Sequence, residues 1–133
     1  MPKKTIALLH PGDMGAAIGA CLVSSGHRVV WASAGRSAAT RTRAADAGLE
    51  DLTSLARAVD AAEIVLSVCP PHGALDLADA IAALEFDGLY VDANAIAPDT
   101  TREAGAIVEA AGARFVDGGI IGPPPVEAGL MRL

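Results

Sequence analysis

Short apolar runs alternate with longer amphipathic segments along almost the whole chain. Within each apolar run the hydrophobic residues are consecutive, which is typical of strands that are buried on both faces of a sheet. We therefore expect strands over residues 5–9, 27–32, 63–69, 89–94 and 113–117. The segments between them carry apolar residues at helical spacing, and we expect helices over residues 14–25, 37–47, 53–59, 74–84 and 98–111.

The alternation of strand and helix predicts an α/β fold with a mainly parallel sheet that is covered by helices on both faces. Because crossovers between parallel strands are right-handed, this order leads to a doubly wound sheet of the Rossmann type. A chain of 133 residues fits a single domain of this kind. Ser37 and Thr53 stand at the starts of the second and third helices, where their side chains are expected to act as N-caps.

The composition narrows the range of partners. Hydrophobic residues make up 52% of the chain but aromatic residues only 3%, so small aliphatic side chains dominate the expected core. The formal net charge of -6 argues against nucleic acid or an anionic membrane as the main partner. No apolar stretch approaches the roughly 20 residues of a membrane helix. Cys21 and Cys69 lie far apart, outside any metal-ligand spacing, so we expect no metal site and a reduced, cytoplasmic protein.

The turn after the first strand carries the first candidate chemistry, in the sequence HPGDMG at residues 10–15. Gly12 and Gly15 occupy the second and third places of the G-x-G-x-x-G pattern, and His10 stands at the first. In a dinucleotide site the second glycine lets the backbone approach a pyrophosphate, while the following helix presents N–H groups to it. A tight structural turn without a ligand is the alternative.

The end of the second strand is expected to contact the adenosine ribose. An NAD site has Asp or Glu about 20 residues past the glycine loop, where it binds the ribose 2′-hydroxyl. The corresponding segment here, residues 31–37, has no carboxylate and instead carries Arg36 followed by Ser37. A guanidinium next to a hydroxyl suits a 2′-phosphate, which favours NADP over NAD. Arg41 and Arg43 on the following helix are more simply explained as part of a solvated face.

Five segments, taken in order, resemble the N-terminal domain of the β-hydroxyacid dehydrogenase superfamily, which includes 6-phosphogluconate dehydrogenase and 3-hydroxyisobutyrate dehydrogenase. They are PGDMG at 11–15, GRS at 35–37, VLSVCPP at 65–71, VDANAIAP at 91–98 and FVDGGIIGPPP at 115–125. Together they extend over nearly the whole chain. The resemblance implies the NADP(H)-binding domain of an oxidoreductase that transfers hydride between the nicotinamide and a small hydroxyacid-like substrate.

The resemblance also implies roles for individual positions. The implied cofactor-binding residues lie in four loops: Gly12, Asp13 and Met14 under the pyrophosphate, Gly35, Arg36 and Ser37 at the 2′-phosphate, Cys69, Pro70 and Pro71 beside the nicotinamide ribose, and Asn94 near the nicotinamide and the substrate. The family's Ser-Thr pair is Asn94-Ala95 here, and Ile121 stands in place of a substrate-binding serine. These departures make an imine substrate, and a reductase of imine or deazaflavin type, an alternative.

The resemblance places residues 1–117 in the dinucleotide-binding domain and residues 118–133 in a glycine- and proline-rich loop that begins a linker to a C-terminal helical domain. In the family that helical domain supplies a catalytic lysine and most of a dimer interface. The lysines of this chain, Lys3 and Lys4, stand at its N-terminus and do not match that position. We therefore expect the catalytic residue outside this chain, an inactive domain on its own, and a longer homodimeric enzyme. A stand-alone module that binds or senses NADP(H) without catalysis is the alternative.

Overall fold

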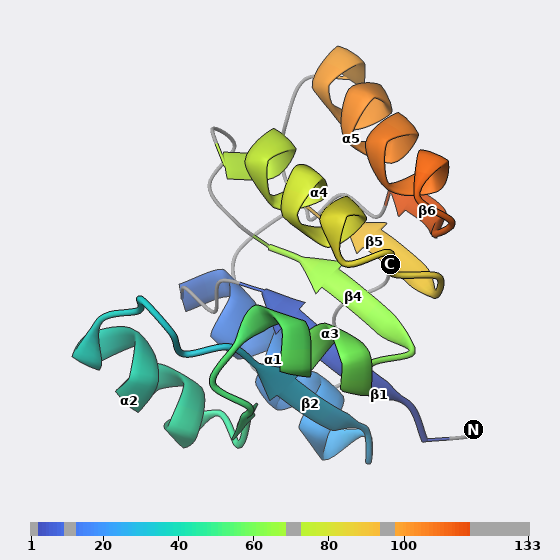
Figure 1. Ribbon diagram of the computed structural model, residues 1–133. Coiled ribbons are helices and arrows are strands. Elements are labelled where there is room, and N and C mark those ends of the chain that lie inside the picture. The colour runs from blue at the N-terminus through green and yellow to red at the C-terminus, as the bar shows by residue number, and fades with distance from the viewer. Residues whose placement is uncertain (1–2, 10–12, 69–72, 94–97, 118–133) are drawn as a thin grey trace.

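Strands and helices alternate along the chain in the computed structural model, which describes residues 3–9, 13–68, 73–93 and 98–117 (Figure 1). The strands are β1 (Thr5–Leu9), β2 (Arg28–Trp31), β3 (Glu50–Asp51), β4 (Ile64–Ser67), β5 (Leu89–Asp92) and β6 (Arg114–Asp117). The helices are α1 (Asp13–Ser24), α2 (Ala38–Asp46), α3 (Leu55–Ala61), α4 (Ala74–Ala83) and α5 (Pro98–Ala110). Except for β3, which was not predicted, the bounds lie within two residues of the expected ones.

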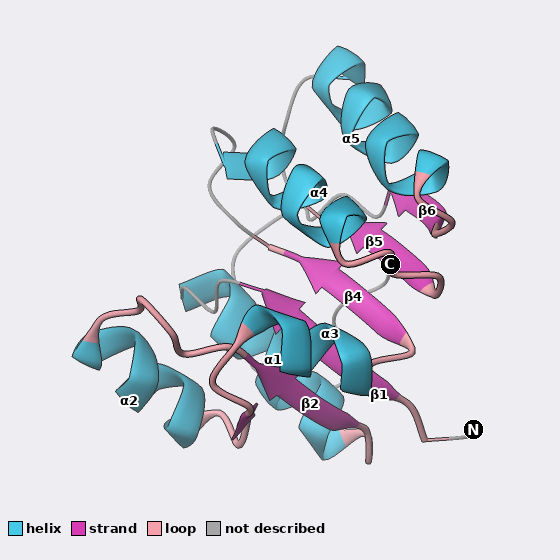
Figure 2. Cartoon of the chain, viewed as in Figure 1, coloured by secondary structure: helices cyan, strands magenta, loops and turns pink. Residues whose placement is uncertain are grey.

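The described strands form one sheet in the order β3-β2-β1-β4-β5-β6 (Figure 2). Every neighbouring pair in it is parallel, so the predicted Rossmann-type fold is confirmed. The chain moves outward from β1 to β3 on one side and from β4 to β6 on the other. Such a reversal of strand order leaves a crevice outside the carboxyl ends of the central strands, where open α/β sheets bind their ligands.

Two apolar layers fix the helices to the sheet. On one face α3, α4 and α5 pack on the buried sheet residues Ala7, Leu9, Val30, Val65 and Tyr90. On the other face α1 and α2 place Ile18 and Ala44 against a second set, Ile6, Leu8, Val29, Trp31, Leu66 and Val91. Burying one Val, Leu or Ile side chain completely contributes roughly 1.5–3 kcal/mol. Both faces of the central strands are therefore covered, as their consecutive apolar residues predicted.

The short strand β3 was not predicted from the sequence because its two residues, Glu50 and Asp51, are both exposed and acidic. Backbone pairing with β2 defines it, with Trp31 opposite Asp51 in the register. The Arg28 side chain of β2 also binds Glu50 with two hydrogen bonds, from Nε at 2.9 Å and from Nη2 at 2.6 Å. The hydrogen bonds from Arg28 hold the pKa of Glu50 below its usual value. None of these interactions leaves an apolar pattern in the sequence.

The N-cap of α3 lies one residue later than predicted. Ser54, not Thr53, is the N-cap: its side chain accepts a hydrogen bond from the Arg57 backbone N–H at 3.2 Å. Thr53 precedes the cap with a φ of 72°. This left-handed conformation is rare for a β-branched residue, so the turn between β3 and α3 must be held by its surroundings.

Among the glycines that the structure describes, Gly88, just before β5, has the least space around it. A Cβ at this position would lie 2.5 Å from the carbonyl oxygen of Glu63 and 2.6 Å from Cζ of Phe86. The Glu63 carbonyl is itself fixed, because it accepts a hydrogen bond from the Leu89 N–H at 3.1 Å. Glycine is required here by the lack of space between neighbouring segments.

The helices of the described part of the chain are short. The longest, α5, has 13 residues, whereas roughly 20 are needed to cross the hydrocarbon core of a bilayer. Accordingly, no helix within the described ranges has the length and apolar character of a membrane span.

Candidate functional site

A small cavity lies at the carboxyl edge of the sheet, beside the ends of β1 and β2. Its volume is about 130 Å³. Leu9, the last residue of β1, lines it together with the loop after β2, which contributes Ala32, Ala34 and Arg36. Leu55 of α3 and Leu77 of α4 complete the lining. The cavity therefore has apolar walls and one cationic side chain, that of Arg36.

The loop after β2 presents Arg36 through a tight turn over residues 33–36. The Arg36 backbone N–H donates to the Ser33 carbonyl oxygen at 2.9 Å, which closes the turn. Gly35 occupies its third position with a φ of 77°, a conformation that turns of type II require there and that glycine adopts without strain. A Cβ on Gly35 would meet nothing within 4 Å, so this glycine is needed for its backbone conformation and not for space.

Ser37 follows directly and begins α2. Its side chain accepts a hydrogen bond from the Thr40 backbone N–H at 3.1 Å, and its hydroxyl lies 3.0 Å from Thr40 Oγ1. The predicted N-cap is thus confirmed. The positive end of the dipole of α2 opens beside Arg36, and helix N-termini favour anions because their first N–H groups have no partner within the helix.

Arg41 also takes part in this region, although the sequence favoured a solvated helix face for it. The Arg41 side chain is exposed, but its Nη2 donates a long hydrogen bond, of 3.5 Å, to the Ser33 carbonyl oxygen. One guanidinium of α2 therefore folds back onto the loop that carries Arg36. Arg36, Arg41 and the N-terminus of α2 thus bring positive charge to this corner of the sheet edge.

Asp51 was not singled out from the sequence, and Thr53 only as an N-cap, yet both support the same loop. Asp51 Oδ1 accepts hydrogen bonds from the backbone N–H groups of Ser33 at 3.3 Å and Thr53 at 2.8 Å. The Thr53 carbonyl oxygen accepts one from the Ala34 N–H at 2.9 Å. A signal existed in the sequence, since Asp two residues before a turn residue is typical of an Asx-turn, but its contact with Ser33 is tertiary.

The carboxyl group of Asp51 is ionised at neutral pH. Loss of contact with water acts to raise its pKa, but hydrogen bonds from Ser33 and Thr53 and the charge of Arg41 outweigh that effect and lower it. The ionised form is the better acceptor for two backbone N–H groups. The environment of Asp51 therefore favours its role as an acceptor for the loop.

The other residues predicted for the site divide into two groups. Asp13 and Met14 open α1, close in the chain to the end of β1, and the structure describes their backbone alone. Five residues lie outside the described ranges: Gly12, Cys69, Pro70, Pro71 and Asn94. Of the predicted site residues, the structure thus places Arg36 in the lining of the cavity, with Gly35 and Ser37 next to it in the chain.

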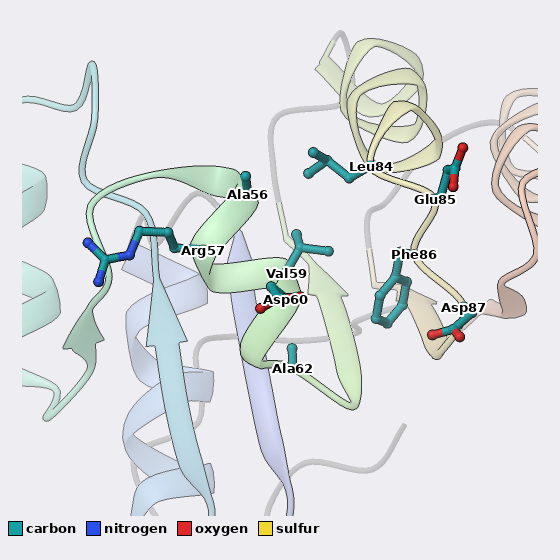
Figure 3. Close-up of a pocket in the computed structure, with 9 residues that line it drawn as sticks. All are labelled: Ala56, Arg57, Val59, Asp60, Ala62, Leu84, Glu85, Phe86 and Asp87. Carbon is teal, nitrogen blue, oxygen red and sulfur yellow. The ribbon is translucent and has the colours of Figure 1, made fainter.

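A larger cavity, of about 450 Å³, lies between α3 and the end of α4 (Figure 3). Figure 3 shows Val59 of α3 facing Leu84 and Phe86 across it. Ala62 and Asp87, which precede β4 and β5, also line it, so it lies toward the amino ends of those strands. It is therefore at the opposite edge from Arg36, and none of the predicted site residues that the structure describes lines it.

Known proteins support the same fold. The 3-hydroxyisobutyrate dehydrogenase of Mycobacterium tuberculosis, solved with L-serine, is 28% identical with a TM-score of 0.82, over 91% of this chain and 42% of that one. A conserved protein of unknown function, described as structurally similar to 3-hydroxyacid dehydrogenases, is 30% identical with a TM-score of 0.78, over 90% of this chain and 44% of that one.

A third solved structure shares the fold alone. It is a reductive aminase from Aspergillus terreus in complex with NADPH and ethyl levulinate, 20% identical with a TM-score of 0.75, over 92% of this chain and 43% of that one. This chain thus spans less than half the length of these three proteins.

No curated protein matches the sequence significantly. The family model for the NAD-binding domain of 6-phosphogluconate dehydrogenase matches residues 5–129, which is nearly the whole chain. The resemblance inferred from the sequence is therefore confirmed, and the fold and the carboxyl-edge cavity agree with it. The chain belongs to the family of NAD-binding domains of 6-phosphogluconate dehydrogenase.

Proposed function

We propose that this domain binds NADP(H) in preference to NAD(H) and holds it for an oxidoreductase that transfers hydride between the nicotinamide and a hydroxyacid-like substrate. The observation that carries the cofactor preference is the position of Arg36. This side chain lines the carboxyl-edge cavity and directly precedes the Ser37 cap of α2. A guanidinium matches the geometry and charge of a phosphate monoester, whereas a ribose hydroxyl gains little from it.

The cavity fits the adenosine end of such a cofactor. Its apolar walls, including Leu55 and Leu77, suit a flat aromatic ring. We assign the adenine to this cavity and the 2′-phosphate to Arg36 and Ser37. The segment over residues 32–37 has no carboxylate, so the loop itself offers no acceptor for a ribose hydroxyl and no repulsion against a phosphate.

The pyrophosphate and the nicotinamide would follow along the carboxyl edge toward the middle of the sheet. Gly12 together with Asp13 and Met14, the first two residues of α1, would hold the pyrophosphate, and residues 69–71 would lie beside the nicotinamide ribose. The nicotinamide supplies the hydride chemistry when it is bound, and the protein contributes binding and orientation. Asn94 is the candidate contact to the substrate, and the proposed enzyme is a cytoplasmic homodimer.

Titration calorimetry of the chain with NADPH and with NADH tests the proposal. We expect NADPH to bind at least about tenfold more tightly, since one good charge-assisted contact contributes roughly 1.5–3 kcal/mol. Adding salt should weaken NADPH binding more than NADH binding, because the extra phosphate is recognised by charge. Equal affinities for the two cofactors would contradict the proposed preference.

Replacing Ser37 by alanine should have two separable effects. The loss of the N-cap should lower the stability of the domain by about 1 kcal/mol, and the loss of the hydroxyl should lower the preference for NADPH. Ser54→Ala is the matched control, because Ser54 caps α3 in the same way through the Arg57 N–H. It should lower the melting temperature by a similar amount and leave the ratio of NADPH to NADH affinity unchanged. If both variants change that ratio equally, Ser37 has no part in the phosphate site.

A further inference from the structure

We infer that Asp51 is a positioning residue for the proposed 2′-phosphate site, because it fixes the loop that presents Arg36 and thereby sets the preference for NADPH. The inference rests on the proposed function. It adds a residue from β3, a strand that the glycine turn and the arginine segment do not involve. Asp51 is not placed in contact with the cofactor and acts through the backbone of the loop.

Two hydrogen bonds connect β3 and the turn after it to the arginine loop, and a third holds that turn in place. Asp51 Oδ1 accepts the N–H of Ser33, the first residue of the turn that Arg36 closes, at 3.3 Å. The same oxygen accepts the Thr53 N–H at 2.8 Å, and the Thr53 carbonyl oxygen accepts the Ala34 N–H at 2.9 Å. Two successive loop residues, Ser33 and Ala34, are thus held from one side by a single carboxylate and the turn that it stabilises.

The backbone of Thr53 shows that this support is needed. Its φ of 72° is unfavourable for a β-branched side chain, so the turn keeps this shape because other contacts hold it. The bond from the Thr53 N–H to Asp51 is the shorter of the two bonds that Oδ1 accepts. Without the carboxylate the turn would relax, and the Thr53 carbonyl would no longer face the Ala34 N–H.

The effect reaches Arg36 through one residue. Ser33 donates its N–H to Asp51 and accepts the Arg36 N–H at its carbonyl oxygen, at 2.9 Å. The side chain of Arg41 reaches that carbonyl as well. Ser33 is 5% exposed and forms the fixed base of the turn, whereas Arg36 is exposed at its end. A shift of Ser33 would move both guanidinium groups relative to the cavity.

The negative charge of Asp51 does not oppose a phosphate at this site as strongly as a carboxylate on the loop would. Oδ1 faces two N–H groups, and Arg41 lies close enough for its charge to stabilise the ionised carboxyl. In an NAD site the carboxylate follows β2 and binds the ribose. Here a carboxylate stands on the neighbouring strand and binds the loop.

The test compares three Asp51 variants with a neighbouring control by titration calorimetry with NADPH and NADH, with the melting temperature of each variant recorded. Asp51→Ala removes the acceptor, and we expect the ratio of NADPH to NADH affinity to fall about tenfold while the NADH affinity stays the same. Asp51→Asn keeps an acceptor oxygen and should retain most of the ratio. Asp51→Glu keeps the charge but displaces the oxygen by one methylene, and it should lower the ratio even where Asp51→Ala fails to fold.

Glu50→Ala is the matched control, since it removes the same charge from the adjacent position, where the carboxylate binds Arg28. It should leave the ratio unchanged. The inference is overturned if the unmutated chain prefers NADPH but Asp51→Ala and Asp51→Glu keep that preference, if the affinities for both cofactors fall equally, or if Asp51→Ala binds NADPH more tightly. A wild-type chain without any preference would instead overturn the proposed function.

Discussion

Replacing Arg36 by alanine should lower the affinity for NADPH by roughly 10- to 100-fold and leave the affinity for NADH almost unchanged. The range corresponds to the roughly 1.5–3 kcal/mol that a hydrogen bond to a charged group contributes. Arg36 is the lining residue of the carboxyl-edge cavity that carries a charge, so its removal should affect the ligand that brings an additional phosphate. Titration calorimetry with both cofactors measures the change directly.

Arg57→Ala serves as the control for this substitution. Arg57 is also an exposed arginine, but it lines the cavity at the opposite edge of the sheet, so its removal changes the net charge equally without touching the proposed site. We expect it to leave the ratio of the two affinities unchanged. If Arg36→Ala weakened NADPH and NADH by the same factor, Arg36 would contribute to binding in general and not to the choice of cofactor.

The substitution Gly88→Ala should destabilise the domain by about 3 kcal/mol, the upper end of the cost of overpacking. The added Cβ would lie 2.5 Å from the Glu63 carbonyl oxygen and 2.6 Å from the buried ring of Phe86. A flexible side chain could move aside, but the carbonyl is held by the Leu89 N–H, and the Gly88 carbonyl in turn accepts the Arg114 N–H at 2.9 Å. The added Cβ would therefore clash with backbone atoms that hydrogen bonds hold between β4, β5 and β6.

Thermal unfolding measures this effect, and at about 4 °C per kcal/mol for a domain of this size the melting temperature should fall by roughly 10 °C. Asp87→Ala, at the neighbouring exposed position, should change stability by less than about 0.5 kcal/mol. Because Gly88 lies at the amino end of β5, far from Arg36 along the sheet, the NADPH preference of the folded variant should be retained. An unchanged melting temperature for Gly88→Ala would show that the backbone gives way at this point.

The fold could be predicted from the sequence because most of its helices and strands have a recognisable pattern of apolar and capping residues. Consecutive apolar residues marked five of the six described strands, and a hydroxyl residue marked the start of α2 at Ser37. The strand β3 carries no such pattern, since Glu50 and Asp51 are joined to β2 by backbone pairing and by the Arg28 side chain. At α3 two hydroxyl residues stand side by side, and only the backbone conformation decides that Ser54 is the cap and Thr53 is not.

The candidate site was predicted where it depends on residue type and missed where it depends on contacts between distant segments. Gly35, Arg36 and Ser37 are neighbours in the chain, and their chemistry could be inferred directly. Asp51 is 18 residues from Ser33 in the sequence, and its function as an acceptor exists only because β3 pairs beside β2. The same is true of Leu55 and Leu77, which reach the cavity from α3 and α4.

The strand β3 also affects how the domain meets other molecules, because it forms one edge of the described sheet. Edge strands expose unpaired backbone groups and can recruit a strand from another chain, which leads to aggregation. Here the edge is only two residues long, and both of its side chains are exposed carboxylates. An approaching strand would find a short hydrogen-bonding ladder and negative charge. The features that concealed β3 in the sequence are thus the ones that protect this edge from intermolecular pairing.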